Sequence, residues 1–448
     1  MSFSGFWNLY RSHFKATLKL AWPIIVGQVG QVMMGVIDTA MVGAVGEEAV
    51  AAAGVSSSVF FLLTVFGFGL STAVSPLVSM ASAKKDYAET AGILRGAYRA
   101  TIMVSLIIQV LLLVMSFQFG LFKQDETVAL LAVDYLRIIS FSVLPMILFL
   151  SAKQFADGLS FTWSSMIITL LAIPMNAFFN WLWIEGNWGF EAMGLNGAGY
   201  ATLLTRIAMM AAMIIYVHRS KNLHVFVFQK PKLVKTFTLK VLKMGIPSGF
   251  QYFFEVAAFG SAMIMAGWIG VAEQAAHQIA INTAALTYMA ATGIAAAGGI
   301  RVGAAFGNFS HTDVRVAGKA ALVLSAAWML FCGSLLAIFR FPVVEFYIDN
   351  REVQDIAARL LIIAALFQLS DGIQAIGLGI LRGISDVRRP MLITLFAYWV
   401  IGLPIGYYLG FVAGFSVEGI WVGLLLGLSV SAILLYWRFN KLTRRLKA

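Results

Sequence analysis

Repeated apolar runs about 20 residues long constrain this chain more than any other feature. A run of that length crosses the ~30 Å hydrocarbon core of a bilayer as one helix. The runs lack a regular period-2 alternation, which favours helices over a transmembrane barrel. We expect twelve spans, near residues 18–43, 50–81, 92–118, 128–151, 162–184, 194–217, 238–268, 275–305, 316–340, 354–380, 389–411 and 418–437. Only 12% of the residues are charged, against about a quarter in soluble domains. The sequence therefore predicts an all-α integral membrane protein.

The net charge of +11 is explained by the distribution of basic residues among the loops. Basic residues crowd every second connection, most densely between Arg219 and Lys243, whereas the intervening loops are mainly acidic. The positive-inside rule then predicts that both termini lie in the cytoplasm. The expected location is the inner (plasma) membrane, with multiple spans. The charge thus indicates topology and contact with membrane lipids, and no nucleic-acid partner is expected.

The two halves of the chain resemble each other at a nearly constant offset. Pro23 corresponds to Pro247, GLSTAVS (69–75) to GIAAAGG (293–299), and GLSFTWSSM (158–166) to GISDVRRPM (383–391). This repeat predicts two six-helix bundles related by a pseudo-two-fold axis along the membrane normal, an arrangement typical of secondary transporters. The expected parts are an N-lobe (1–218), a cytoplasmic linker (219–237) and a C-lobe (238–448).

Four charged residues lie deep within predicted spans, where a charge is costly and usually serves function. They are Asp38, Arg206, Glu255 and Asp371. Because the acids outnumber the one base, the expected ligands are cations: H⁺, Na⁺ or organic amines. The single cysteine, Cys332, and five scattered histidines favour neither a disulfide nor a structural metal site.

Each half of the sequence offers neutral polar partners for its acids. Asn176 and Asn180 lie four residues apart after Pro174, and Thr202 adds a hydroxyl; with Asp38 these oxygens make a plausible shell for a hard cation. The alternative for the two amides and the hydroxyl is hydrogen bonding between helices. In the second half, Glu255 and Asp371 are expected to share a polar pocket with Gln278, Asn282 and Gln374, or to form a structural hydrogen-bonded pair.

Several motifs resemble those of the multidrug and toxic compound extrusion (MATE) transporters, in their bacterial norfloxacin-efflux branch. They are AWP (21–23), IDTAMVG (37–43), PMNAFFN (174–180), IRVGAAFG (300–307) and D-x-x-Q-x-x-x-x-G-x-L-R-G (371–383). The resemblance runs nearly end to end. It implies two six-helix lobes around a V-shaped cavity and export of small cationic amphipathic drugs in exchange for Na⁺ or H⁺. It also implies that Asp38, Asn176, Asn180 and Thr202 form an N-lobe cation site, and that Glu255 and Asp371 are C-lobe coupling acids. No other cofactor is expected, and the protein is expected to act as a monomer.

Two positions depart from the pattern of that branch. A tyrosine often found one turn before the C-lobe aspartate is Phe367 here, which we group with the expected substrate cavity and which removes a phenolic ligand for Na⁺. Arg206 follows Thr202 by one helical turn and acts as a modulator if it faces Asp38, with which it could pair.

Other functions remain as alternatives. An exporter or flippase of a metabolite or lipid-linked substrate could use a related fold, although a polyanionic cargo would favour more basic residues than the single deep Arg206. An intramembrane enzyme is not expected, because no nucleophile–base or metal-binding constellation appears.

Overall fold

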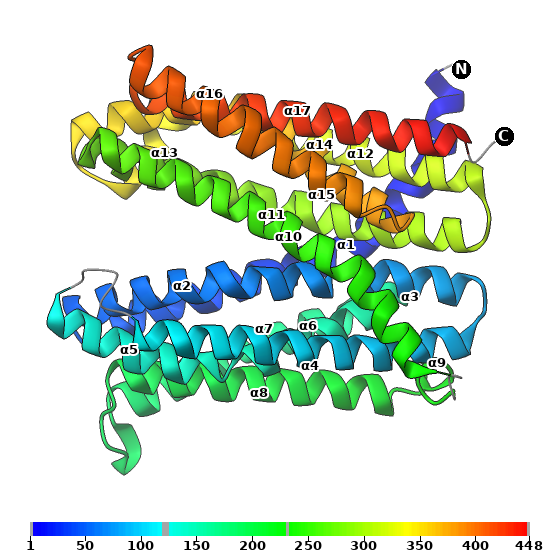
Figure 1. Cartoon of the computed structure of the whole chain (residues 1–448), viewed down its shortest axis with the longest axis horizontal. Coiled ribbons are helices and arrows are strands. Elements are labelled where there is room, and N and C mark those ends of the chain that lie inside the picture. The colour runs from blue at the N-terminus through cyan, green and yellow to red at the C-terminus, as the bar shows by residue number, and fades with distance from the viewer. Residues whose placement is uncertain (1–2, 119–124, 230–232, 446–448) are drawn as a thin grey trace. The chain divides into compact units, whose positions relative to one another are not determined.

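The computed structural model describes residues 3–118, 125–229 and 233–445, and within them all regular structure is helical (Figure 1). The helices of the first half are α1 (Phe3–Val42), α2 (Glu47–Ser71), α3 (Val74–Ala83), α4 (Tyr87–Phe117), α5 (Glu126–Ser140), α6 (Val143–Gly158), α7 (Thr162–Ile184), η2 (Asn187–Gly189), α8 (Leu195–Arg219) and α9 (His224–Val227). Those of the second half are α10 (Val234–Ile269), α11 (Val271–Gly307), α12 (His311–Ile338), α13 (Arg340–Tyr347), α14 (Arg351–Gly383), α15 (Arg388–Leu395), η3 (Phe396–Gly402), α16 (Leu403–Tyr407), η4 (Tyr408–Val412) and α17 (Ser416–Arg445).

These helices confirm the predicted membrane class. Among the described residues, eleven helical segments are long and apolar enough to cross a membrane, or twelve when α5 and α6 count as one span bent by 41°. The bend lies at Phe141 and Ser142, between the two helices.

The chain forms two compact units whose boundaries differ from the expected lobes. The N-terminal unit is Val26–Gly249, and the C-terminal unit combines Met1–Ile25 with Phe250–Ala448. Each boundary lies within a continuous helix, two residues after Pro23 in α1 and after Pro247 in α10. The expected linker at 219–237 is thus part of the N-terminal unit; its Lys230, Pro231 and Lys232 lie outside the described residues.

Packing explains both differences from the expected lobes. At the start of α1, Arg301 of α11 donates hydrogen bonds to the His13 carbonyl and to Thr17 Oγ1, each at 2.7 Å, so this segment belongs with the C-terminal unit. At the start of α10, a Cβ on Gly96 of α4 would lie 2.6 Å from the Phe237 carbonyl carbon. That close approach of two backbones joins the first turns of α10 to the N-terminal unit.

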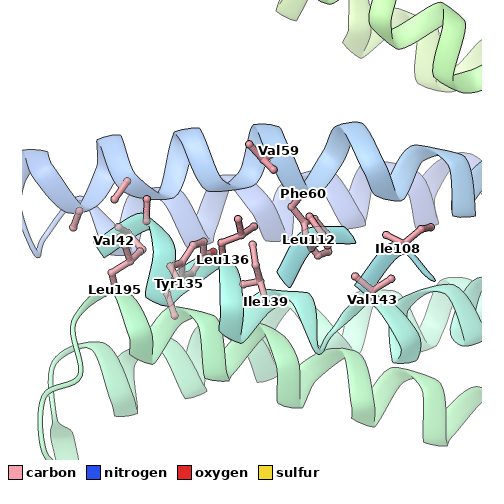
Figure 2. Close-up of a cluster of buried hydrophobic side chains, with 14 of the residues drawn as sticks. Val42, Val59, Phe60, Ile108, Leu112, Tyr135, Leu136, Ile139, Val143 and Leu195 are labelled. Carbon is pink, nitrogen blue, oxygen red and sulfur yellow. The ribbon is translucent and has the colours of Figure 1, made fainter. Parts of the chain in front are cut away.

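Apolar side chains from seven helices, α1, α2 and α4 to α8, form the core of the N-terminal unit. Figure 2 shows Val42 of α1, Phe60 of α2, Leu112 of α4, Leu136 of α5 and Leu195 of α8 within one cluster of buried side chains, which Val143 of α6 extends. Their burial holds together the helices that carry the polar residues described next.

Candidate functional site

The four N-lobe residues expected to bind a cation lie together in the N-terminal unit. Asn180 Nδ2 of α7 donates to Asp38 Oδ1 of α1 at 2.6 Å, and Thr202 Oγ1 of α8 donates to Asp38 Oδ2 at 3.3 Å. Asn180 Nδ2 also lies 3.5 Å from Asn176 Oδ1. Helix α7 places the two amides on one face because they are four residues apart.

Two atoms of this cluster are buried without a hydrogen-bond partner. They are Asn180 Oδ1 and Asn176 Nδ2. An amide carries an acceptor oxygen beside its NH₂ group, so a rotated Asn180 amide would present its oxygen toward Asp38. The cluster can therefore switch from amide donors on a bare carboxylate to oxygen ligands around a cation.

Arg206 shares this region but is not in an ion pair with Asp38. Its Nη1 donates to Ser142 Oγ at 2.6 Å, and its guanidinium lies over the Phe60 ring, 4.9 Å from the centroid. No ion pair of the described residues includes Arg206, although its charge still interacts electrostatically with Asp38. Arg206 is thus held at the bend between α5 and α6, and the Asp38 carboxylate is left without a salt bridge.

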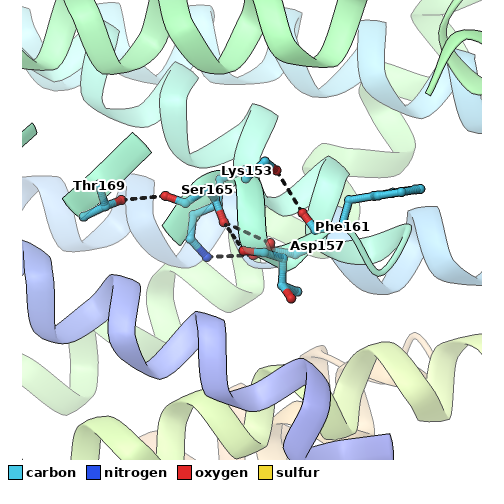
Figure 3. Close-up of polar contacts among 7 residues, drawn as sticks. Lys153, Asp157, Phe161, Ser165 and Thr169 are labelled. Carbon is cyan, nitrogen blue, oxygen red and sulfur yellow. Dashed lines mark hydrogen bonds and ion pairs between the residues drawn. The ribbon is translucent and has the colours of Figure 1, made fainter. Parts of the chain in front are cut away.

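The sequence interpretation missed a buried ion pair in the same unit. The fourth span was expected to end near residue 151, with Lys153 in a loop; instead α6 continues to Gly158. Lys153 Nζ lies 2.6 Å from Asp157 Oδ2, and both side chains are almost completely buried. Ser165 Oγ of α7 donates to Asp157 Oδ1 at 3.3 Å, and Thr169 donates to the Ser165 carbonyl, so the network continues along α7 (Figure 3). The i, i+4 spacing of Lys153 and Asp157 between apolar residues was the available signal.

The C-terminal unit holds a second acidic cluster, built around Glu255 of α10 and Asp371 of α14. Tyr288 of α11 donates its hydroxyl hydrogen to Glu255 Oε1 at 3.1 Å, while Glu255 Oε2 is buried without a partner. Only 7% of Glu255 and 8% of Asp371 is exposed, and the two carboxylates interact electrostatically. Among the described residues neither carboxylate is in an ion pair. The sequence did not single out Tyr288, which supplies a phenol although Phe367 does not.

The remaining residues of the expected C-lobe pocket make other contacts. Gln374 is fully buried and exchanges hydrogen bonds with the Tyr398 hydroxyl, at 2.9 and 3.2 Å. Gln278 Nε2 donates to Asn282 Oδ1 at 2.9 Å, and no hydrogen bond among the described residues joins this pair to Glu255 or Asp371. Phe367 is 1% exposed and stacks on Trp421, so it packs in the core of the C-terminal unit.

Tyr398 lies in a stretch of π-helix, η3, which ends two residues before Pro404. Proline lacks the N–H of a helical hydrogen bond, and π-helical turns are one way in which a helix accommodates such a break. The wider turn brings the Tyr398 hydroxyl to Gln374, three residues after Asp371.

Both clusters offer oxygen atoms as ligands. Carboxylate and hydroxyl oxygens occur in each, amide oxygens are added in the N-terminal unit, and hard cations prefer such ligands. Within the described part of the chain, no group of three or more His, Cys, Asp or Glu side chains could hold a metal ion.

Comparisons with known proteins agree with this architecture. The MatE family model matches residues 23–182 and 247–408, once in each half, as the internal repeat predicts. The probable multidrug resistance protein NorM of Rhizobium meliloti is 35% identical over 98% of this chain and 96% of its own length. The multidrug resistance protein NorM of Vibrio vulnificus is 33% identical over 97% of each chain.

Solved structures share the fold at low sequence identity. The eukaryotic MATE transporter AtDTX14 superimposes with a TM-score of 0.88 at 19% identity, over 98% of this chain and 99% of that chain. A MOP superfamily transporter from Pyrococcus furiosus gives a TM-score of 0.84 at 19% identity over the whole of both chains. With a family model matching both halves and relatives of this similarity along the whole length, the chain belongs to the MatE family, and it is a membrane transporter and not an enzyme.

Proposed function

We propose that this protein is a multidrug efflux antiporter that exports small cationic amphipathic compounds in exchange for Na⁺ or H⁺ by alternating access. The relatives named multidrug resistance protein NorM, at 33–35% identity along nearly the whole chain, support the efflux function. The MatE match supports secondary transport by two related halves.

The observation that carries the proposed coupling is an acidic cluster without a salt bridge in each unit. Asp38 accepts hydrogen bonds from the neutral donors Asn180 and Thr202, and Glu255 accepts one from Tyr288. A carboxylate at membrane depth without a fixed counter-ion is costly. A proton, Na⁺ or a cationic drug can each remove that cost, so the three compete for the same negative charge.

Competition for the carboxylates couples drug export to ion entry, and the inward ion gradient gives the transport cycle its direction. A cationic drug from the cytoplasm neutralises the empty carboxylates, and Na⁺ or H⁺ entering from outside replaces it. In the N-terminal unit, Asn176, Asn180 and Thr202 would supply oxygens to the incoming ion. Arg206 is the modulator of that site, because its fixed charge weakens the hold of Asp38 on any cation. The working protein is a monomer in the inner membrane with both termini in the cytoplasm.

A second candidate is export or flipping of a metabolite or lipid-linked substrate. The observation in its favour is the Pyrococcus furiosus transporter of the same fold, whose reverse polarity of the binding pocket is said to suggest a different function. A polyanionic cargo would need several inward basic side chains, and Arg206 is already bonded to Ser142.

The deciding experiment is exchange of norfloxacin or ethidium in proteoliposomes, with a Na⁺ gradient and a pH gradient imposed separately. We expect uphill drug movement with at least one gradient, and the effective gradient identifies the coupling ion. Failure of both gradients to drive either cation, combined with transport of an anionic lipid-linked substrate, would support the second candidate instead.

The Asp38→Asn variant tests the site itself. The amide has nearly the same shape but no charge, so we expect the dependence of efflux on the coupling ion to fall. Efflux equal to wild type with an unchanged ion dependence would remove Asp38 from the coupling role.

A further inference from the structure

A groove on the surface of the N-terminal unit lies apart from both acidic clusters. It has a volume of about 390 Å³ and is lined by Arg99, Ile102 and Met103 of α4 and by Lys235 and Thr238 of α10. The two helices meet tightly beside it, since a Cβ on Gly96 would lie 2.7 Å from the Thr238 nitrogen. The groove is therefore a fixed feature of the α4–α10 packing within one unit.

The two cations of the groove have no acidic partner. Both Arg99 and Lys235 are exposed, no acid lines the groove, and no ion pair of the described residues includes either side chain. Lys240, one turn further along α10, is by contrast paired with Glu89 of α4. The groove thus carries two uncompensated positive charges next to a pair that is already neutralised.

An apolar surface continues from the groove along α4. Ile102, Met103, Leu106, Ile107, Val110, Leu111 and Val114 are all exposed and recur at helical spacing on one face. Between Arg99 and the end of α4 at Phe117 there is no charged residue. This run rises about 27 Å at 1.5 Å per residue, close to the thickness of the hydrocarbon core. Arg99 therefore lies at the hydrocarbon boundary, at the depth of lipid phosphates.

We propose that this groove binds an anionic phospholipid, with the phosphate between Arg99 and Lys235 and an acyl chain along the exposed face of α4. Guanidinium and ammonium groups bind phosphate oxygens by charge-assisted hydrogen bonds. A soluble anion would use only the basic end of the groove, whereas a phospholipid also covers the apolar face that starts there. Two unpaired cations favour an anionic headgroup over a zwitterionic one, because only the anionic lipid leaves a net negative charge to compensate them.

Native mass spectrometry of the whole protein in a neutral detergent tests the proposal, because it measures how much of each lipid stays bound. Dioleoyl phosphatidylglycerol and dioleoyl phosphatidylcholine differ in headgroup charge and have the same acyl chains. We expect wild-type protein to bind the first at least about tenfold more tightly. The Arg99→Gln/Lys235→Gln variant should lose most of this preference. Both side chains are exposed, so the variant is expected to fold, and an unchanged elution volume and melting temperature verify this.

The matched control is Arg388→Gln/Arg389→Gln, which removes two exposed cations of α15 that do not line the groove. It should retain the preference. An equal loss in both double variants would mean a general effect of surface charge and would overturn the proposal. Equal binding of the two lipids by the wild-type protein would also overturn the proposal. Displacement of phosphatidylglycerol by millimolar inorganic phosphate would overturn it too, because it would indicate a site for a free anion.

Discussion

Lys153 and Asp157 form a buried ion pair in the N-terminal unit, so each charge has an opposite partner. Both side chains are almost fully buried, and Ser165 satisfies a further carboxylate oxygen. Removing one partner of such a pair leaves an uncompensated charge, whereas replacing both with apolar residues is often neutral. Asp38 differs, because its hydrogen-bond partners Asn180 and Thr202 are neutral and it is in no ion pair among the described residues.

The pairing of two buried charges predicts that single variants at 153 and 157 are less stable than a double variant. We expect Asp157→Leu or Lys153→Met alone to destabilise the protein by about 3–5 kcal/mol, and the double variant to recover most of the loss. Thermal unfolding in detergent, followed by tryptophan fluorescence, measures both effects. Single variants as stable as wild type, or a double variant worse than both, would contradict the interpretation of a paired, desolvated charge.

If Asp38 binds the coupling ion as proposed, the charge of Arg206 should weaken that binding. Its charge acts on Asp38 from a position fixed by Ser142 and Phe60. We expect Arg206→Gln to lower the coupling-ion concentration that gives half-maximal drug transport by about tenfold, because one repelling charge is removed. Arg206→Lys keeps the charge and should stay near wild type.

Comparing the two Arg206 variants distinguishes an effect of the positive charge from an effect of the shape of the side chain. Both lose the planar guanidinium that lies over Phe60, so a purely structural role would change both alike. The control is Arg137→Gln, which removes an arginine paired with Asp134 at 3.6 Å and should not move half-saturation.

At the scale of helices, close backbone contacts set the packing of the C-terminal unit. A Cβ on Gly423 of α17 would lie 2.4 Å from the Gly406 backbone, and one on Gly427 would lie 2.9 Å from the Ala397 carbonyl oxygen. Small residues four apart let membrane helices approach without a hydrophobic driving force between them. Gly299 of α11 makes a similar approach to α14, since a Cβ there would lie 2.7 Å from the Gly379 carbonyl oxygen.

This packing predicts that Gly423→Ala is destabilising by at least about 1–3 kcal/mol, the usual cost of overpacking. Gly260→Ala, also in a helix of the C-terminal unit, is the control, since its Cβ would meet nothing within 4 Å. It should be neutral or slightly stabilising. The two melting temperatures in detergent provide the comparison, and equal values would show that α17 can shift away from α16 at little cost.

The sequence predicted those helices and residues whose signal is local. Asp38, Asn176, Asn180 and Thr202 were recognisable because polar side chains are conspicuous in apolar spans, and they do lie together. The bond from Arg206 to Ser142 and its contact with Phe60 were not predictable, because a hydroxyl and an apolar ring carry no sign of their partner. The unit boundaries at Ile25 and Gly249 differ from the expected lobes for a related reason. Each falls inside an unbroken helix, where a nearby proline predicts a kink and not a division between units.

At the scale of the whole molecule, each unit carries one of the two acidic clusters described above. The number of clusters that load an ion sets the net charge moved across the membrane in each cycle. If each cluster loads one monovalent cation from outside while one monovalent drug leaves, one net positive charge moves inward. A membrane potential of 100 mV, negative inside, then adds about 2.3 kcal/mol, which is roughly a 50-fold larger drug gradient at equilibrium. The duplicated architecture thus predicts electrogenic exchange.

Proteoliposomes clamped with valinomycin and K⁺ measure this directly, with the coupling-ion gradient held constant. For wild type we expect the accumulation ratio of a monovalent cationic drug to rise about 50-fold per 100 mV. Asp38→Asn leaves only the cluster of Glu255 and Asp371, so one coupling ion should exchange for one drug. The accumulation ratio should then no longer respond to voltage, although it should still respond to the ion gradient. Glu255→Gln/Asp371→Asn should give the same result from the other unit. A voltage response that persists unchanged in both variants would mean that the two clusters do not each carry one coupling ion.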